Sequence, residues 1–195
     1  MEEREERDAM SRPSREMGWT NSGFVEALHV AGPTEERADK LMLFGQFVGS
    51  WELECTRIDS NGRKVHMDGE VHFGWVLGGR AVQDIWIVPG RGQPGEGESP
   101  LAFHGTTVRF YDDNIGAWRS TWVEPVNGRV RRFIGQLVDG TIVLLSDEDE
   151  PRLRWKFTNV QSDAFTWVGE ISTDGGGTWT VEEVMHASRK LQSQA

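Results

Sequence analysis

The chain is poor in cysteine, tyrosine and long apolar runs. Among its 195 residues there is one cysteine, Cys55, and one tyrosine. A single cysteine excludes a disulfide framework within the chain and a cysteine-rich zinc site. No apolar run reaches the roughly 18 residues that a transmembrane helix needs, and the charged start of the chain lacks the apolar stretch of a secretory signal. We therefore expect a cytoplasmic protein.

Positively charged residues are also fewer than negatively charged ones. The chain has 21 Lys and Arg residues against 31 Asp and Glu residues, which gives a formal net charge of −10 and a pI near 5.0. Nucleic acids and anionic membrane surfaces are bound by clustered positive charge. We therefore expect neither a nucleic acid nor a membrane among the partners of this protein.

Charge and hydropathy divide the chain into four parts. Residues 1–21 are predicted to be a disordered acidic leader, because they are charged and almost free of apolar side chains. Residues 22–48 are predicted to be helical and to pack on the rest of the domain, with Thr34 as an N-cap before two acidic residues. Residues 49–190 are predicted to form a β-barrel, and residues 191–195 a tail.

Short segments of alternating hydropathy, separated by turn signals, fill the chain from residue 50 onward. Because each segment meets the next through a short connection, we expect an all-β, antiparallel up-and-down meander of about ten strands that closes into a barrel. The exception is residues 89–100, a Gly- and Pro-rich stretch predicted to be a mobile loop over one end of the barrel. The predicted strands are 50–58, 64–76, 80–88, 101–112, 117–125, 129–138, 141–146, 152–160, 164–173 and 178–189.

Tryptophan, by contrast, is abundant. The chain has nine, and all except Trp19 lie in or beside the predicted strands. Indole is large, flat and apolar, and its one N–H needs a partner when it is buried. A tryptophan on almost every strand predicts a Trp-lined barrel interior, which either fills the barrel or surrounds a ligand.

The sequence Gly49-Ser50-Trp51 opens the first strand, and Arg189 lies near the end of the last. This G-x-W with a terminal Arg resembles the calycin superfamily of lipocalins and fatty-acid-binding proteins, which implies a structural role for both residues: Trp51 closes the barrel bottom and Arg189 packs across it. Together with Leu77-Gly78-Gly79-Arg80, Phe110-Tyr111-Asp112 and Asp174-Gly175-Gly176, the chain over about residues 40–190 looks like a bacterial lipocalin-like family of mostly unassigned function. The layout is also similar to the haem-binding nitrobindins.

If Trp51 and Arg189 point inward, the two-residue period of a strand predicts which neighbours do so as well. On the first strand these are Leu53 and Cys55. On the last they are Met185, Glu183, Val181 and Trp179, unless a bulge inverts part of the list. Glu183 is then an interior carboxylate, with Arg109 and Arg80 as candidate partners, or else it is a solvated residue at the rim.

Polar side chains accompany the aromatic ones on several strands. Asp84 shares a face with Trp86, Arg109 with Tyr111, and Ser120 with two tryptophans. Polar groups set among aromatic rings are what a pocket needs to orient a mostly apolar ligand, although each could instead face solvent. Cys55 could equally be a small core residue. The expected ligand-binding residues are Trp86, Arg109, Trp118, Trp122, Trp167, Trp179, Met185 and Cys55.

Signals for metals and cofactors are weak. The five histidines are scattered, and His66 and His72 share a strand face but lie too far apart for one metal. We expect no metal and no cofactor. A nitrobindin-like haem site would need one well-placed histidine, which His104 or His186 could supply only in a different register.

Three functions remain open. The first is a cofactor-free cyclase or isomerase of secondary metabolism that shapes a small hydrophobic substrate, with Glu183 or Asp84 as the catalytic acid or base. The second is a carrier or sensor without chemistry, and the third is the haem binder. A homodimer through the N-terminal helix or a barrel face is compatible with each.

Overall fold

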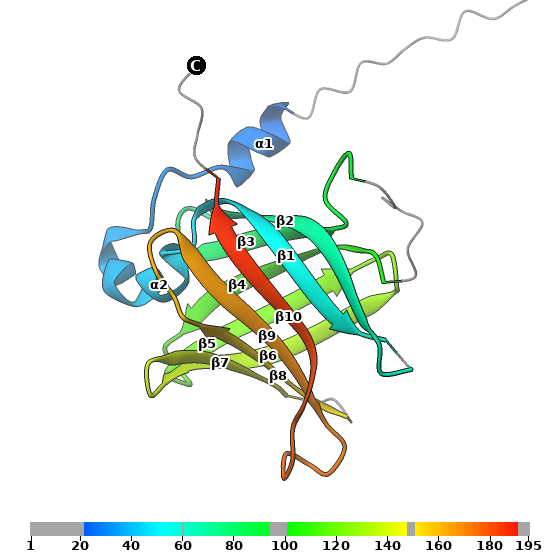
Figure 1. The fold of residues 1–195 in the computed structure, drawn as a ribbon. Helices are drawn as coiled ribbons and strands as arrows, with labels where there is room; N and C mark the ends of the chain where they lie inside the picture. The colour runs from blue at the N-terminus through cyan, green and yellow to red at the C-terminus, as the bar shows by residue number, and fades with distance from the viewer. Residues whose placement is uncertain (1–21, 60, 94–100, 148–150, 191–195) are drawn as a thin grey trace, which may run out of the picture.

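Ten strands follow one another around a closed antiparallel barrel in the computed structural model, which describes residues 22–59, 61–93, 101–147 and 151–190 (Figure 1). Each strand pairs with the next along the chain, and the first closes the barrel against the last. The predicted all-β, up-and-down barrel is therefore confirmed. The strands are β1 (Gly49–Ile58), β2 (Lys64–Val76), β3 (Ala81–Val88), β4 (Phe103–Asp112), β5 (Ala117–Glu124), β6 (Arg129–Val138), β7 (Thr141–Ser146), β8 (Arg152–Thr158), β9 (Ala164–Ser172) and β10 (Thr180–Arg189).

Short helices, rather than one long helix, precede the barrel. α1 (Ser22–Leu28) is followed by the 3-10 turn η1 (Glu35–Arg37) and by α2 (Ala38–Gly45). Thr34 occupies the N-cap position of η1, as expected, but its side chain makes no capping hydrogen bond. Instead, the backbone N–H of Thr34 donates to the carbonyl of Gly79 in the β2–β3 turn, which fixes this segment to the barrel.

The meander gives the barrel two different ends. At the helix end, where β1 begins and β10 finishes, α2 packs into the barrel opening (Figure 1). Its buried Phe44 stacks edge-on to Trp118 with the ring centroids 4.7 Å apart, and Phe47 just beyond it lies 5.0 Å from Phe157. This aromatic layer fills the helix end. The far end is where β1 and β3 finish and where β4 and β6 begin.

Trp51 and Arg189 hold the helix end together. The Trp51 ring is fully buried, and its Nε1–H donates to the Phe47 carbonyl at 2.7 Å. The Arg189 guanidinium lies over the Trp51 ring, 4.0 Å from the centroid, which gains cation–π attraction. Arg189 also donates to the carbonyls of Gln46, Val48 and Ser162. The pair thus joins α2, β1 and the β8–β9 turn.

A β-bulge in β10 changes which side chains enter the barrel. Between Val181 and Glu183 the pairing with β9 shifts by one residue, so the inward phase holds from Glu183 to Ala187 and not before it. The inward directions expected for Val181 and Trp179 are therefore wrong. Val181 is 36% exposed, and Trp179 stacks on Arg154 outside the barrel. The insertion of one residue inverts every side chain on one side of it.

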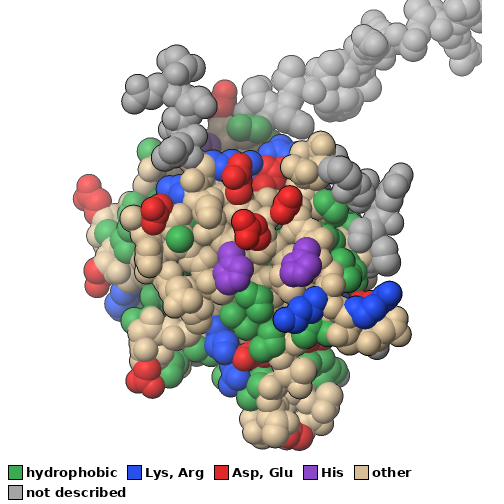
Figure 2. Space-filling view, viewed as in Figure 1, with side chains coloured by type: hydrophobic (Ala, Val, Ile, Leu, Met, Phe, Trp, Pro, Cys, Tyr) green, Lys and Arg blue, Asp and Glu red, His purple; other side chains and the backbone are tan. Residues whose placement is uncertain are grey.

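The outer surface of the barrel carries charge of both signs. On the face in Figure 2, acidic, basic and histidine side chains are interspersed rather than gathered by sign. No helix in the described part of the chain is long and apolar enough to cross a membrane. The predicted leader with Trp19, the C-terminal tail and most of the predicted loop 89–100 lie outside the described residues.

Candidate ligand-binding cavity

A cavity of about 450 Å³ occupies the far half of the barrel. Its lining comes from the strand ends opposite α2, because there the strands are no longer filled by the aromatic layer of the helix end. Small-molecule sites in proteins have volumes of roughly 300–1,000 Å³. The cavity is therefore large enough for a compact organic ligand.

Tryptophans form a continuous wall along this cavity. Trp155 stands at its centre, with ring centroids 5.4 Å from Trp167 and 6.0 Å from Trp122, both in edge-to-face geometry. Trp86 continues the wall 6.0 Å beyond Trp167, and Phe133 supports Trp155 from behind at 4.0 Å. Tilted and edge-to-face pairs stabilise one another beyond the area they bury, so the wall is preorganised.

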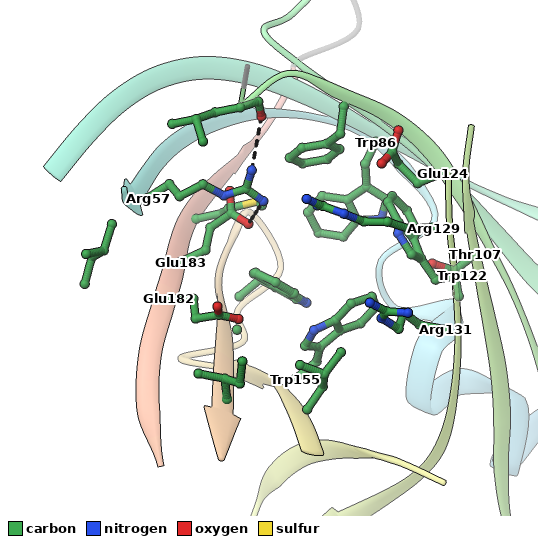
Figure 3. A pocket seen from close by; sticks show the side chains of 18 of the residues that line it. Arg57, Trp86, Thr107, Trp122, Glu124, Arg129, Arg131, Trp155, Glu182 and Glu183 are labelled. Carbon is green, nitrogen blue, oxygen red and sulfur yellow. Dashed lines mark hydrogen bonds and ion pairs between the residues drawn. The ribbon is translucent and has the colours of Figure 1, made fainter. Parts of the chain in front are cut away.

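Glu183 brings a carboxylate to the cavity at the far end of β10 (Figure 3). The side chain is buried, and its Oε2 accepts a hydrogen bond from Arg57 Nη2 at 2.8 Å. Its Oε1 has no partner among the described residues. Burial raises the pKa of Glu183, and the Arg57 charge opposes that rise only in part. Glu183 therefore has one oxygen held by Arg57 and one buried oxygen without a partner among the described residues.

Asp84 and Arg109 form a buried ion pair on adjacent strands, β3 and β4. Both side chains are almost inaccessible, and Arg109 Nη1 donates to Asp84 Oδ2. The other oxygen of Asp84 accepts the backbone N–H of Thr107 at 2.9 Å. Arg109 lines the cavity and Asp84 does not. Asp84, expected as a catalytic residue, thus contacts Arg109 and the β4 backbone in the structure and is not part of the cavity lining.

Further charged side chains surround the cavity near the β5–β6 turn (Figure 3). Glu124 is buried and accepts hydrogen bonds from the backbone and side-chain nitrogens of Asn127, the latter at 2.8 Å. Arg129 and Arg131 also line the cavity, from the start of β6. The buried charges are thus paired or hydrogen-bonded, and additional cations lie beside them.

The structure brings together most of the residues expected to bind a ligand. Trp86, Arg109, Trp122, Trp167 and Met185 all line the cavity with Glu183. Arg57 is the partner of Glu183, in place of the expected Arg109 or Arg80, because Arg57 faces it directly across the β1–β10 pairing.

Three expected ligand-binding residues lie elsewhere. Trp118 is buried against Phe44 in the layer that fills the helix end, and Trp179 lies outside the barrel because of the bulge. Cys55 points inward beside Met185 but is not part of the cavity lining. Burial raises the pKa of its thiol, so Cys55 is a neutral core residue.

The sequence analysis missed Trp155 and Arg57 as site residues. The sequence contains a signal for each of these two residues. Trp155 lies in a predicted strand, and Arg57 is two residues beyond Cys55 and so shares its predicted inward face. Arg129 had no comparable signal, because its place beside Glu183 depends on how β6 and β10 lie across the barrel.

The histidines lie away from this cavity. His104 and His186 are exposed on the outside of β4 and β10, and none of the described residues that line the cavity is a histidine. Among the described residues there is also no group of three His, Cys, Asp or Glu side chains arranged to hold a metal ion. The lining combines indole and other apolar side chains with guanidinium, carboxylate and hydroxyl groups, which suits an organic ligand.

The fold is shared by several solved structures. The S-type phycobiliprotein lyase CPES from Guillardia theta matches with a TM-score of 0.53 at 14% identity, over 83% of this chain and 100% of that chain. Rv2717c from M. tuberculosis matches with a TM-score of 0.56 at 13% identity, over 77% of this chain and 97% of that chain. The sequence matches no family model and no curated protein. At this level of identity, the likeness is one of fold alone.

Proposed function

We propose that this protein binds a small, flat and largely apolar molecule inside the barrel. The observation that carries the proposal is the wall of Trp86, Trp122, Trp155 and Trp167 beside a cavity of about 450 Å³. A core that served stability alone would fill this volume, as the aromatic layer at the helix end does. A cavity lined by rings instead favours a ligand that stacks on them.

The polar groups give such a ligand an orientation. Glu183 Oε1 accepts a hydrogen bond from a hydroxyl or N–H group, while Arg57 keeps the other oxygen in place. Arg129 and Arg131 add positive charge at the start of β6. Since the apolar wall supplies the contact area, these groups select among ligands rather than drive their binding.

Replacing Trp155 tests this proposal. Equilibrium dialysis of fluorene, a flat tricyclic hydrocarbon, against Trp155→Leu should give an affinity roughly tenfold below that of the unmodified protein, because the central ring of the wall is lost. Trp179→Leu is the matched control, since Trp179 lies outside the barrel, and should bind fluorene as before. No binding of fluorene to the unmodified protein, or equal losses in both variants, would refute the proposal.

A cofactor-free isomerase or cyclase is the second candidate, and Glu183 favours it. A carboxylate whose pKa burial raises, with one oxygen unpartnered at a ligand cavity, is suited to accept a proton from carbon and return it elsewhere. The Trp wall would hold the substrate in the reactive shape. A phycobiliprotein lyase among the structures of the same fold is in keeping with chemistry in such a barrel. Asp84 contributes only by positioning Arg109.

Proton exchange separates this enzyme from a carrier. In D₂O, the protein should accelerate deuterium uptake at the carbon next to the carbonyl of 1-tetralone, followed by NMR. Glu183→Gln should bind the ketone within about twofold of the unmodified protein but lose the acceleration, because an amide cannot accept the proton. Exchange at the buffer rate in the unmodified protein would favour the carrier or sensor, and undiminished exchange in Glu183→Gln would exclude Glu183 as the base.

A further inference from the structure

Three polar atoms on β4 and β5 are buried without any hydrogen-bond partner in the described part of the chain. They are Thr107 Oγ1, Arg109 Nε and Ser120 Oγ, which we call the polar trio. Each of the three residues is at most 2% exposed. Buried polar groups are almost always satisfied, so a cluster of unsatisfied ones requires an explanation.

The strand geometry places these three side chains together. Thr107 and Arg109 are two residues apart on β4 and therefore share its inward face. Ser120 lies directly opposite Arg109 in the pairing of β4 with β5. Thr107 and Arg109 both line the cavity, whereas Ser120 lies beside Arg109 and is not part of the lining. The trio thus marks the inner end of the cavity, next to the aromatic layer, whereas Glu183 lies at the far end of the barrel.

The trio offers hydrogen bonds without net charge. Asp84 already neutralises Arg109 and has its second oxygen bound to a backbone N–H. The guanidinium is further enclosed by aromatic rings, with its carbon 5.0 Å from the Phe44 centroid and 5.8 Å from that of Phe157. A carboxylate placed here would be a second anion beside Arg109 with only one positive charge to share, and its burial would be costly.

We propose that the polar trio receives a neutral carbonyl oxygen of the ligand, which makes the ligand a flat aromatic ketone, quinone or lactone. This inference rests on the proposed function and specifies the ligand class for the same cavity. Arg109 Nε–H and the Thr107 hydroxyl, which both line the cavity, donate to the two lone pairs of the oxygen, one to each. The rings of the ligand then extend along the Trp wall toward Glu183. Without such a guest, a buried water molecule would have to satisfy the trio.

The test compares ligands that differ only at the carbonyl carbon. 9-Fluorenone carries the carbonyl, fluorene lacks it, and 9-fluorenecarboxylate replaces it with an anion. In equilibrium dialysis, Thr107→Val should weaken binding of 9-fluorenone by about tenfold and leave that of fluorene unchanged. Thr121→Val is the matched control on the outward face of β5 and should alter neither. The unmodified protein should bind 9-fluorenecarboxylate more weakly than 9-fluorenone.

Infrared spectroscopy provides a direct readout of the same contact. The carbonyl stretch of bound 9-fluorenone should lie at lower wavenumber in the unmodified protein than in Thr107→Val, because hydrogen bonds weaken the C=O bond. Equal ketone affinity and equal stretching frequency in the unmodified protein and Thr107→Val would overturn the ketone subsite while fluorene binding still supported the cavity. Preferred binding of the carboxylate would overturn it too. If neither fluorene nor 9-fluorenone binds, the proposed function fails and this inference fails with it.

Discussion

At the scale of single residues, three buried carboxylates of the barrel differ in their hydrogen-bond partners. Asp84 is enclosed with Arg109 and uses both oxygens, so it is committed to structure. Glu70 on β2 is held by Arg91 and His72, and the hydrogen bond from Arg91 lowers its pKa to about 2. Glu183 keeps one oxygen free, and burial raises its pKa. Of these three, Glu183 alone combines a cavity position with an oxygen that has no hydrogen-bond partner among the described residues.

The opposite pKa shifts of Glu70 and Glu183 predict opposite pH effects on stability. The folded pKa of Glu70 is below its ordinary value of 4.5, so the stability it contributes is present above pH 4.5 and is lost as the pH falls toward 2. The folded pKa of Glu183 is above its ordinary value, so its contribution is fully present below that value and is lost as the pH rises through the folded pKa.

Thermal unfolding across the acid range measures both effects. As the pH rises, the difference in Tm between the unmodified protein and Glu70→Gln should grow, and the difference between the unmodified protein and Glu183→Gln should shrink. Each substitution serves as the control for the other, because both replace a buried glutamate in a strand by its uncharged analogue. Two differences that change in the same direction would contradict the pKa shifts.

At the scale of elements, the strands were predictable because turn-forming residues mark their boundaries in the sequence. Turn pairs such as Asn127-Gly128 and Asp139-Gly140 supply left-handed backbone exactly where a hairpin needs it, and positive φ occurs at Gly128, Asp139 and Gly140 in the structure. The bulge between Val181 and Glu183 has no such mark. One extra residue leaves the hydropathy pattern nearly unchanged, and the orientation of Trp179 could not be derived without it.

Glycines within strands show how closely the Trp wall is fitted to the sheet. At Gly105 on β4, an added Cβ would lie 2.4 Å from the Trp122 ring and 2.9 Å from the Val123 carbonyl oxygen. Gly105→Ala should therefore displace Trp122, lower stability by about 1–3 kcal/mol and weaken fluorene binding.

Gly74→Ala on β2 is the matched control, because an added Cβ there meets nothing within 4 Å, and it should leave stability equal or slightly higher. Denaturant unfolding and dialysis test both. Equal effects would show that strand propensity, rather than the fit to Trp122, is responsible.

At the scale of the whole molecule, closure was predictable and the cavity was not. The G-x-W opening and the terminal Arg predicted the contact of Trp51 with Arg189, and that contact closes the barrel at the expected place. The division into a filled half and a hollow half depends on how far α2 reaches into the barrel, which no local pattern encodes. Trp118 and Trp155 show this well: both lie on strands with comparable patterns, yet one is in the core and the other at the cavity. A cytoplasmic location, a homodimer and the particular bacterial family stay predictions.

The aromatic layer at the helix end makes the barrel a blind pocket. A ligand that enters from the far end of the barrel must leave through the same end. The carbonyl of the proposed ligand would enter first and leave last. Chemical variation should consequently be tolerated unequally along the guest: bulk added near the carbonyl would meet Phe44 and Phe157, whereas a side chain added at the trailing edge would extend toward the ends of β1 and β6. The proposed ketone subsite would thus recognise one edge of the ligand, and the cavity would accept a series of compounds that differ at the other edge.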